Sequence, residues 1–176
     1  MNKKVLRMCR CAVFTGILCI LAQITVYLPS IVPITMQTFA VYLIALCLSP
    51  LDATISTMLY IVLGAIGLPV FSGFNGGLSS LIGPAGGFIF SFPIMALVIS
   101  LMVKYKDDIK TNVISLIVGT GVTYFIGSIW FMFITKSSIV VTLTACVLPF
   151  IIGDSLKIFI SIIIAKRLKT RINFDL

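Results

Sequence analysis

The 176-residue chain contains no histidine and no glutamate, and only 10% of its residues are charged. Without histidine the usual zinc sites and His-based catalytic triads are excluded, and the missing glutamates remove the commonest proton-relay side chain. No GK[ST] sequence is present, so a Walker-type ATP site is excluded too. The sequence therefore predicts no metal site, no cofactor and no ATPase activity of its own.

What the chain has instead is apolar sequence: 60% of its residues are hydrophobic and the mean hydropathy is +1.21. These values are typical of an integral membrane protein. A bilayer core of about 30 Å takes about 20 helical residues to cross, so six crossings would use most of the chain. Little sequence remains for a soluble module, which must belong to another chain if one is needed.

Prolines, glycines and charges divide the chain into six apolar segments. We expect a single all-α integral membrane domain, residues 1–176, in which six transmembrane helices form a bundle. We also expect Asp52 to cap the third helix and Trp130 to lie at a membrane interface. The expected spans are approximately 11–28, 34–48, 53–68, 88–103, 113–134 and 141–165.

The net charge of +8 predicts orientation rather than nucleic-acid binding, because the basic residues flank the apolar segments. With six spans, 11 basic residues fall on the side of the two termini and Lys136 falls alone on the other side. Basic loops stay in the cytoplasm, so both termini are predicted to be cytoplasmic. Two polar or glycine-rich loops, 29–38 and 69–87, then face outward.

Asp154 and Lys157 lie within the last apolar segment. Residues three apart share a helix face, at about 5 to 6 Å between their Cβ atoms, so the two side chains can pair or hold one polar ligand. Charges inside a membrane cost at least about 2.5 to 3.5 kcal/mol each, which favours a functional site over a purely structural ion pair. We expect Pro149 and Gly153 to loosen the helix above the pair.

The two outer loops supply further candidate binding groups. Thr35 and Gln37 follow two prolines in the first loop, and the second is rich in glycine and contains Asn75 and Gly86. Irregular backbone at membrane depth is tolerated where it is buried in protein or lines a cavity. We therefore predict an outward-open pocket floored by Asp154 and Lys157. Its donors and acceptors suit a compact ligand with N–H groups and a carbonyl, such as a vitamin.

Five segments of the sequence resemble, in order, the biotin-specific substrate-binding (S) component of energy-coupling-factor (ECF) transporters, the BioY family. Together they extend over nearly the whole chain. The segments are Leu21-Ala22-Gln23-Ile24, Val32-Pro33-Ile34-Thr35-Met36-Gln37-Thr38-Phe39-Ala40-Val41, Gly64-Ala65-Ile66-Gly67-Leu68-Pro69-Val70-Phe71, Gly83-Pro84-Ala85-Gly86-Gly87-Phe88 and Pro149-Phe150-Ile151-Ile152-Gly153-Asp154-Ser155-Leu156-Lys157.

This resemblance implies high-affinity capture of biotin from outside a prokaryotic cell by a multi-pass protein of the cytoplasmic membrane. It also implies partners: a transmembrane coupling protein and two cytoplasmic ATPase subunits. By position, Asp154, Lys157 and Asn75 would hydrogen-bond the ureido ring, and Gln37 would lie near the valerate end. Ile89 stands where some relatives place a basic residue for the ligand carboxylate.

Ala12 and Gly16 form a small-xxx-small pair on the first span. Such a pair allows close helix packing, either inside the bundle or with another protein. The resemblance favours the second interpretation, because the family has its coupling-protein face there.

Three alternatives remain from the sequence. One is an S component for another vitamin, such as thiamine or riboflavin. The second is an intramembrane enzyme using Ser155 or Asp154 with Lys157, although these spacings do not place Ser155 on the same helix face as the pair. The third is a pore, which would need rings of polar residues that the spans lack.

Overall fold

The computed structural model describes residues 3–26 and 32–171, and helices make up most of it. The expected end of the first span at Leu28 and the following Pro29 lie outside the described residues. The elements are α1 (Lys3–Leu21), β1 (Thr25–Val26), β2 (Ile34–Thr35), α2 (Gln37–Cys47), α3 (Pro50–Ala65), the 3-10 turn η1 (Ser72–Phe74), α4 (Leu78–Ile82), α5 (Gly86–Tyr105), α6 (Ile109–Thr135), α7 (Ile139–Cys146) and α8 (Leu148–Arg171).

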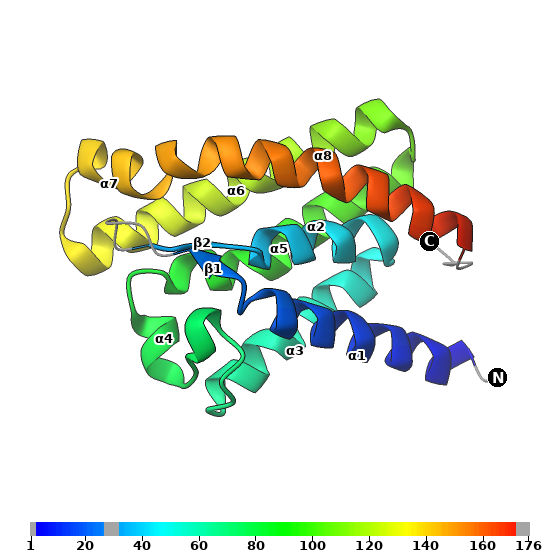
Figure 1. The fold of residues 1–176 in the computed structure, drawn as a ribbon, viewed down its shortest axis with the longest axis horizontal. Coiled ribbons are helices and arrows are strands. Elements are labelled where there is room, and N and C mark those ends of the chain that lie inside the picture. Colours follow the sequence, from blue (N-terminus) through cyan, green and yellow to red (C-terminus); the bar gives the residue numbers. More distant parts are fainter. Residues whose placement is uncertain (1–2, 27–31, 172–176) are drawn as a thin grey trace.

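The longer helices run roughly side by side, and α1 begins at the same end of the bundle at which α8 ends (Figure 1). The short elements β1, β2, α4 and α7 lie toward the opposite end. Helix α2 is enclosed by α1, α3, α5 and α8, and all its residues except Thr38 are buried. A helix that is apolar all round suits such a position.

Three stretches of the described chain are long and apolar enough to cross a membrane: α5, α6 and Ile139–Arg171. Helices α2 and α3 are apolar but shorter, with 11 and 16 residues. At about 1.5 Å per residue α2 extends roughly 16 Å, about half of a bilayer core. Each expected span overlaps a helix, but the bounds of the first two are wrong: α1 already ends at Leu21, and residues 25–26 and 34–35 form strands. Six complete crossings remain a prediction.

The last expected span is divided at Val147, where α7 ends and α8 begins. Pro149 lacks an N–H group and restricts the residue before it, which explains why a continuous helix stops here. Asp154 consequently lies on the second turn of α8, about 10 Å from its start, instead of about 20 Å along one helix. The expected loosening by Pro149 thus moves the ion pair toward the end of the bundle that carries the loops.

Helices α5 and α6 pack closely because α6 lacks side chains at the contact points. A Cβ atom at Gly119 would lie 2.5 Å from Ile99 Cγ1, and one at Gly127 would lie 2.4 Å from the Phe88 ring. Gly121 differs, since a Cβ atom there would meet nothing within 4 Å. The interface therefore depends on Gly119 and Gly127, whereas Gly121 faces open space.

Replacing Gly119 with alanine should destabilise the bundle by about 1 to 3 kcal/mol, because the added methyl group overpacks the contact with Ile99. Gly121→Ala is the matched control. It should be neutral or stabilising by up to about 1 kcal/mol, since alanine is the better helix former and finds space. Thermal unfolding in detergent compares the two variants, and equal destabilisation would contradict the packing explanation.

A line of polar contacts joins α1 to α3 along their shared face. Arg7 binds Asp52 at 2.7 Å between Nη2 and Oδ1, and the Thr15 hydroxyl donates to the Ser56 carbonyl at 3.0 Å. The Cys11 thiol donates to the Asp52 carbonyl. The expectation that Asp52 caps α3 is wrong, because Ser49 accepts the N-cap bond and the Asp52 carboxylate instead binds Arg7.

The turn between α5 and α6 is held by its charges. The Asp108 carboxylate caps α6 by accepting a bond from the Thr111 N–H at 2.9 Å, and Asp107 binds Lys169 of α8 at 2.8 Å. Hydrogen bonding from Thr111, with Lys106 3.1 Å away, lowers the pKa of Asp108 to about 2. The cap thus stays ionised above about pH 3, and the turn ties α6 to the end of α8.

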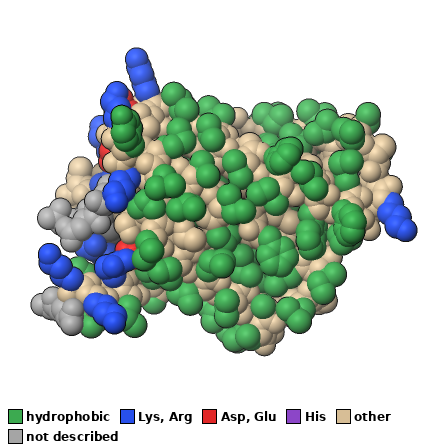
Figure 2. Space-filling model, turned by 180° about the vertical axis from the view of Figure 1, so that it is seen from behind, with side chains coloured by type: hydrophobic (Ala, Val, Ile, Leu, Met, Phe, Trp, Pro, Cys, Tyr) green, Lys and Arg blue, Asp and Glu red, His purple; other side chains and the backbone are tan. Residues whose placement is uncertain are grey.

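Lysine and arginine side chains gather at the end of the molecule where α1 begins and α8 ends (Figure 2). The surface between the two ends is mainly hydrophobic on the visible face. Exposed large apolar residues occur on α1, α3, α5, α6 and α8. A soluble protein rarely exposes so much contiguous apolar surface, so the distribution is that of a protein surrounded by lipid.

Candidate functional site

The ion pair between Asp154 and Lys157 is buried, with 3% and 7% of each residue exposed. Lys157 Nζ lies 2.8 Å from Asp154 Oδ1, and it also donates to the Thr35 carbonyl at 2.8 Å and to Thr38 Oγ1 at 3.0 Å. The Thr38 hydroxyl in turn lies 3.3 Å from Asp154 Oδ1. All three ammonium donors thus have acceptors, which is what a buried lysine requires.

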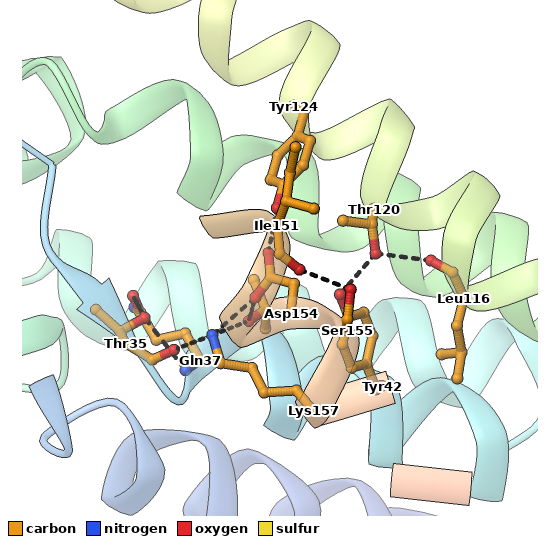
Figure 3. Close-up of polar contacts among 11 residues, drawn as sticks. Thr35, Gln37, Tyr42, Leu116, Thr120, Tyr124, Ile151, Asp154, Ser155 and Lys157 are labelled. Carbon is orange, nitrogen blue, oxygen red and sulfur yellow. Dashed lines mark hydrogen bonds and ion pairs between the residues drawn. The ribbon is translucent and has the colours of Figure 1, made fainter. Parts of the chain in front are cut away.

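Tyr124 of α6 completes the network. Its hydroxyl donates to Asp154 Oδ2 at 2.6 Å, so the aspartate is held from α8, α2 and α6 at once (Figure 3). Nearby, the hydroxyls of Tyr42 and Thr120 share a 2.6 Å hydrogen bond that links α2 to α6. The site residues predicted from the sequence do not include Tyr124, Thr38 or Tyr42, although each places a polar group in an apolar segment.

A cavity lies directly beside this network, toward the end of the bundle that carries β1, β2 and α4. In this structure the volume of the cavity is about 50 Å³, so a ligand larger than a few water molecules must displace some of the lining side chains. Asp154, Lys157, Thr35 and Thr38 belong to its polar part. Its remaining surface is mostly apolar, with aromatic side chains Phe88, Phe92, Tyr124 and Phe150. Such a mainly apolar hollow with a few polar groups is typical of a small-molecule site.

Thr35 and Gln37 of the first loop region also line the cavity. The Thr35 carbonyl accepts from Lys157, and its hydroxyl donates to Gln37 Oε1 at 2.9 Å. Gln37 donates from Nε2 to the Tyr60 hydroxyl at 2.5 Å. Both polar atoms of the Gln37 amide therefore have protein partners, and the antiparallel pair β1–β2, with Thr25 opposite Thr35, fixes the backbone beside them.

Two candidates from the second loop do not join this cluster. Asn75 is exposed, lies outside the cavity lining and donates from Nδ2 to the Ser72 carbonyl at 2.8 Å. Gly86 is buried at the start of α5, where a Cβ atom would lie 1.7 Å from the Leu81 carbonyl oxygen. The structure thus gives Gly86 a packing role, and contact of Asn75 with a ligand stays a prediction. Ser72 and Ala85 are the residues by which this loop reaches the cavity.

Ile89 lines the cavity, whereas Ser155 lies on the exposed side of α8. Ile89 is buried and contributes apolar surface to the cavity. Ser155 is exposed, and its hydroxyl donates to the carbonyl of Ile151 on its own helix at 2.7 Å. It therefore points away from the face that carries Asp154 and Lys157, which argues against Ser155 as a nucleophile activated by either group.

The small-residue pair on α1 lies on the surface. Ala12 is exposed, and a Cβ atom at Gly16 would meet nothing within 4 Å. The opposite face of the helix carries the buried residues Cys11, Phe14, Thr15 and Leu18. Ala12 and Gly16 are therefore not an internal packing seam of this chain, and the face that they form is open to another protein or to lipid.

Removing the Tyr124 hydroxyl should weaken ligand binding at this cavity by about 10-fold or more. Asp154 Oδ2 loses its 2.6 Å hydrogen bond in Tyr124→Phe, and one hydrogen bond to a charged group is worth about 1.5 kcal/mol or more. Tyr105→Phe is the matched control, because Tyr105 is 93% exposed at the far end of α5. Isothermal titration with biotin compares them, and equal affinities would contradict this role of Tyr124.

Known proteins that are similar to this chain in sequence or structure are biotin transporters. The family model described as BioY matches residues 1–174. The chain is 37% identical to a probable biotin transporter BioY of Pyrococcus horikoshii, over 90% of this chain and 93% of that one. It is 34% identical to the biotin transporter BioY of Thermotoga maritima, over 91% and 94%. The crystal structure of a biotin S component from an ECF-type ABC transporter superposes with a TM-score of 0.89 at 29% identity, over 96% and 93% of the chains.

Proposed function

This chain belongs to the BioY family, and from that membership we propose that it captures biotin in the cavity beside Asp154 and Lys157. Its function is biotin uptake as the S component of an ECF-type transporter, and it is not an enzyme. The observation that carries the site proposal is the burial of an acid and a base side by side on the wall of a mainly apolar cavity.

The ureido ring of biotin matches these two groups. Its N–H groups are donors for the Asp154 carboxylate, and its carbonyl oxygen is an acceptor for the Lys157 ammonium group. Both side chains now bind each other and Thr38, so biotin replaces part of this network and exchanges protein hydrogen bonds for ligand hydrogen bonds. The fused rings and the valerate chain then pack against Phe88 and Phe92.

The valerate carboxylate belongs near the mouth of the cavity. Lys157 is the one cation among the described lining residues, and the ureido ring uses it. Ile89 offers no charge at the position where some relatives have a basic residue. The carboxylate therefore depends on water, on hydroxyl groups such as that of Ser72, and on backbone N–H groups. Gln37 Nε2 has two N–H donors and gives one to Tyr60, so the other suits a carboxylate that lies within reach.

The protein is proposed to lie in the cytoplasmic membrane of a prokaryotic cell, with the cavity open to the outside. Prokaryotic transporters among its relatives and its apolar helices support the membrane location. The basic end of the molecule supports the orientation, with both termini in the cytoplasm (Figure 2). Lys136, at the C-terminal end of α6, lies at the other end of the bundle.

The chain is proposed to work with a transmembrane coupling protein that contacts the Ala12–Gly16 face and with two cytoplasmic ATPase subunits. The sequence holds no phosphate-binding loop, which agrees with ATP hydrolysis by separate subunits. The exposed small residues on α1 suit close approach of a partner helix in the membrane.

Mass spectrometry of the detergent-purified protein tests the proposed ligand directly. Biotin should be retained after purification from cells grown with biotin. Titration of the ligand-free protein with biotin, thiamine and riboflavin should give binding for biotin alone. Binding of thiamine or riboflavin in preference to biotin would overturn the proposed specificity and favour an S component for another vitamin.

A further inference from the structure

Gln23 lies just after α1, in the turn that leads to β1, and its side chain connects this turn to the outer loop. Its Nε2 group donates to the Cys19 carbonyl at 3.0 Å and to the Val70 carbonyl at 3.1 Å. Its Oε1 atom accepts from the Phe74 N–H at 2.8 Å. The amide group of Gln23 therefore binds the outer loop at Val70 and at Phe74, and it anchors the loop to the end of α1.

The loop segment 70–75 between these points is tightly built. The Phe71 N–H donates to the Asn75 carbonyl at 2.9 Å, which closes the segment on itself. The Phe71 side chain is 1% exposed, and its ring occupies the space where a Cβ atom of Gly64 would be. Segment 70–75 is thus held in place in two ways: its own Phe71 side chain is buried, and Gln23, outside the segment, hydrogen-bonds to its backbone.

The same segment touches the biotin cavity. Ser72, between the two bonds made by Gln23, lines the cavity. Phe71 meets the Tyr60 ring edge to face, with centroids 5.3 Å apart, and the Tyr60 hydroxyl accepts from Gln37, another lining residue. Opening of segment 70–75 would remove Ser72 from the wall and take away the packing partner of Tyr60.

We propose that Gln23 is the positioning residue that holds segment 70–75 closed over the cavity and thereby sets how slowly biotin leaves. It touches no ligand and acts through the loop. The proposal rests on the biotin function proposed above. A bound molecule behind a closed loop leaves only when the loop opens, so loss of two of the loop's hydrogen bonds raises the opening probability and the dissociation rate.

The test compares Gln23→Met with Thr25→Val. Methionine keeps the length of the side chain but loses all three hydrogen bonds. Thr25→Val is the matched control, because the Thr25 hydroxyl donates to the Ala22 carbonyl at 2.9 Å in the same turn and makes no bond to segment 70–75. Binding kinetics with immobilised protein and free biotin give both rate constants for each variant and for the unmodified chain.

The expected result for Gln23→Met is a dissociation rate about 10-fold higher with little change in the association rate, because about two net hydrogen bonds of the closed state are lost. Thr25→Val should leave both rates unchanged. Hydrogen exchange adds a readout independent of biotin: the Phe74 amide should exchange faster in Gln23→Met and at the original rate in Thr25→Val.

An unchanged dissociation rate in Gln23→Met would overturn the proposal, as would equal changes of both rates in the two variants, since that pattern reports only a weakened helix end. Failure of the unmodified chain to bind biotin in the same experiment would instead refute the proposed function. The exchange rate at Phe74 would in that case still decide whether Gln23 holds the loop.

Discussion

Replacing Lys157 with methionine should weaken biotin binding by at least 10-fold. The variant removes the one cation among the described cavity-lining residues and leaves the buried Asp154 carboxylate with hydroxyl donors alone. Breaking a buried pair in this way costs about 3 to 5 kcal/mol of stability, because the remaining charge stays desolvated. Equilibrium titration with biotin measures the affinity, and thermal unfolding measures the stability separately.

A double variant, Asp154→Asn with Lys157→Met, separates a binding role from a structural one. Both buried charges are then absent, and replacing a whole pair by neutral groups is often close to neutral for stability. The double variant should therefore regain thermal stability relative to Lys157→Met while biotin binding stays lost. Ser155→Ala on the exposed face of α8 should change neither quantity. Full biotin affinity in the double variant would refute the site.

Replacing Gly16 with leucine should reduce biotin uptake by cells at least 10-fold and leave the affinity of the purified protein unchanged. A Cβ atom at this position would meet nothing within 4 Å, so we expect the larger side chain to be accommodated by this chain and to block what docks on the face shared with Ala12. Uptake of labelled biotin in cells that also carry the coupling subunits, compared with titration of the purified variant, measures the two effects.

Val13→Leu is the control for this experiment. Val13 is 60% exposed and neighbours the small-residue face, so its enlargement tests whether any added bulk on α1 harms uptake. It should leave uptake near the original level. Parallel loss of binding and uptake in Gly16→Leu would mean that the residue supports the fold of the chain, and the proposed partner face would then be wrong.

The sequence predicted the part of the site that depends on local spacing. Asp154 and Lys157 are three residues apart on one helix, so their pairing follows from helix geometry. Pro149 indicated the helix interruption that places them near the loop end of the bundle. Tyr124 could not be found in this way, since it is 30 residues from Asp154 and reaches it only through the packing of α6 against α8.

The errors in local structure also have physical causes. Asp52 and Ser49 are both good N-cap residues, and the sequence does not show that Arg7 is available to bind Asp52. The pair β1–β2 has two residues in each strand, too few for a periodic pattern. The second outer loop also contains helix α4 and the turn η1, which its many glycines concealed.

The contacts between α1 and α3 bear on how the protein can move. Arg7 and Thr15 attach α1 to α3 at levels two turns apart, so neither helix can slide along the other without breaking both attachments. A force applied to the outer surface of α1 is therefore passed on to α3, because it cannot be relieved by sliding between the two helices.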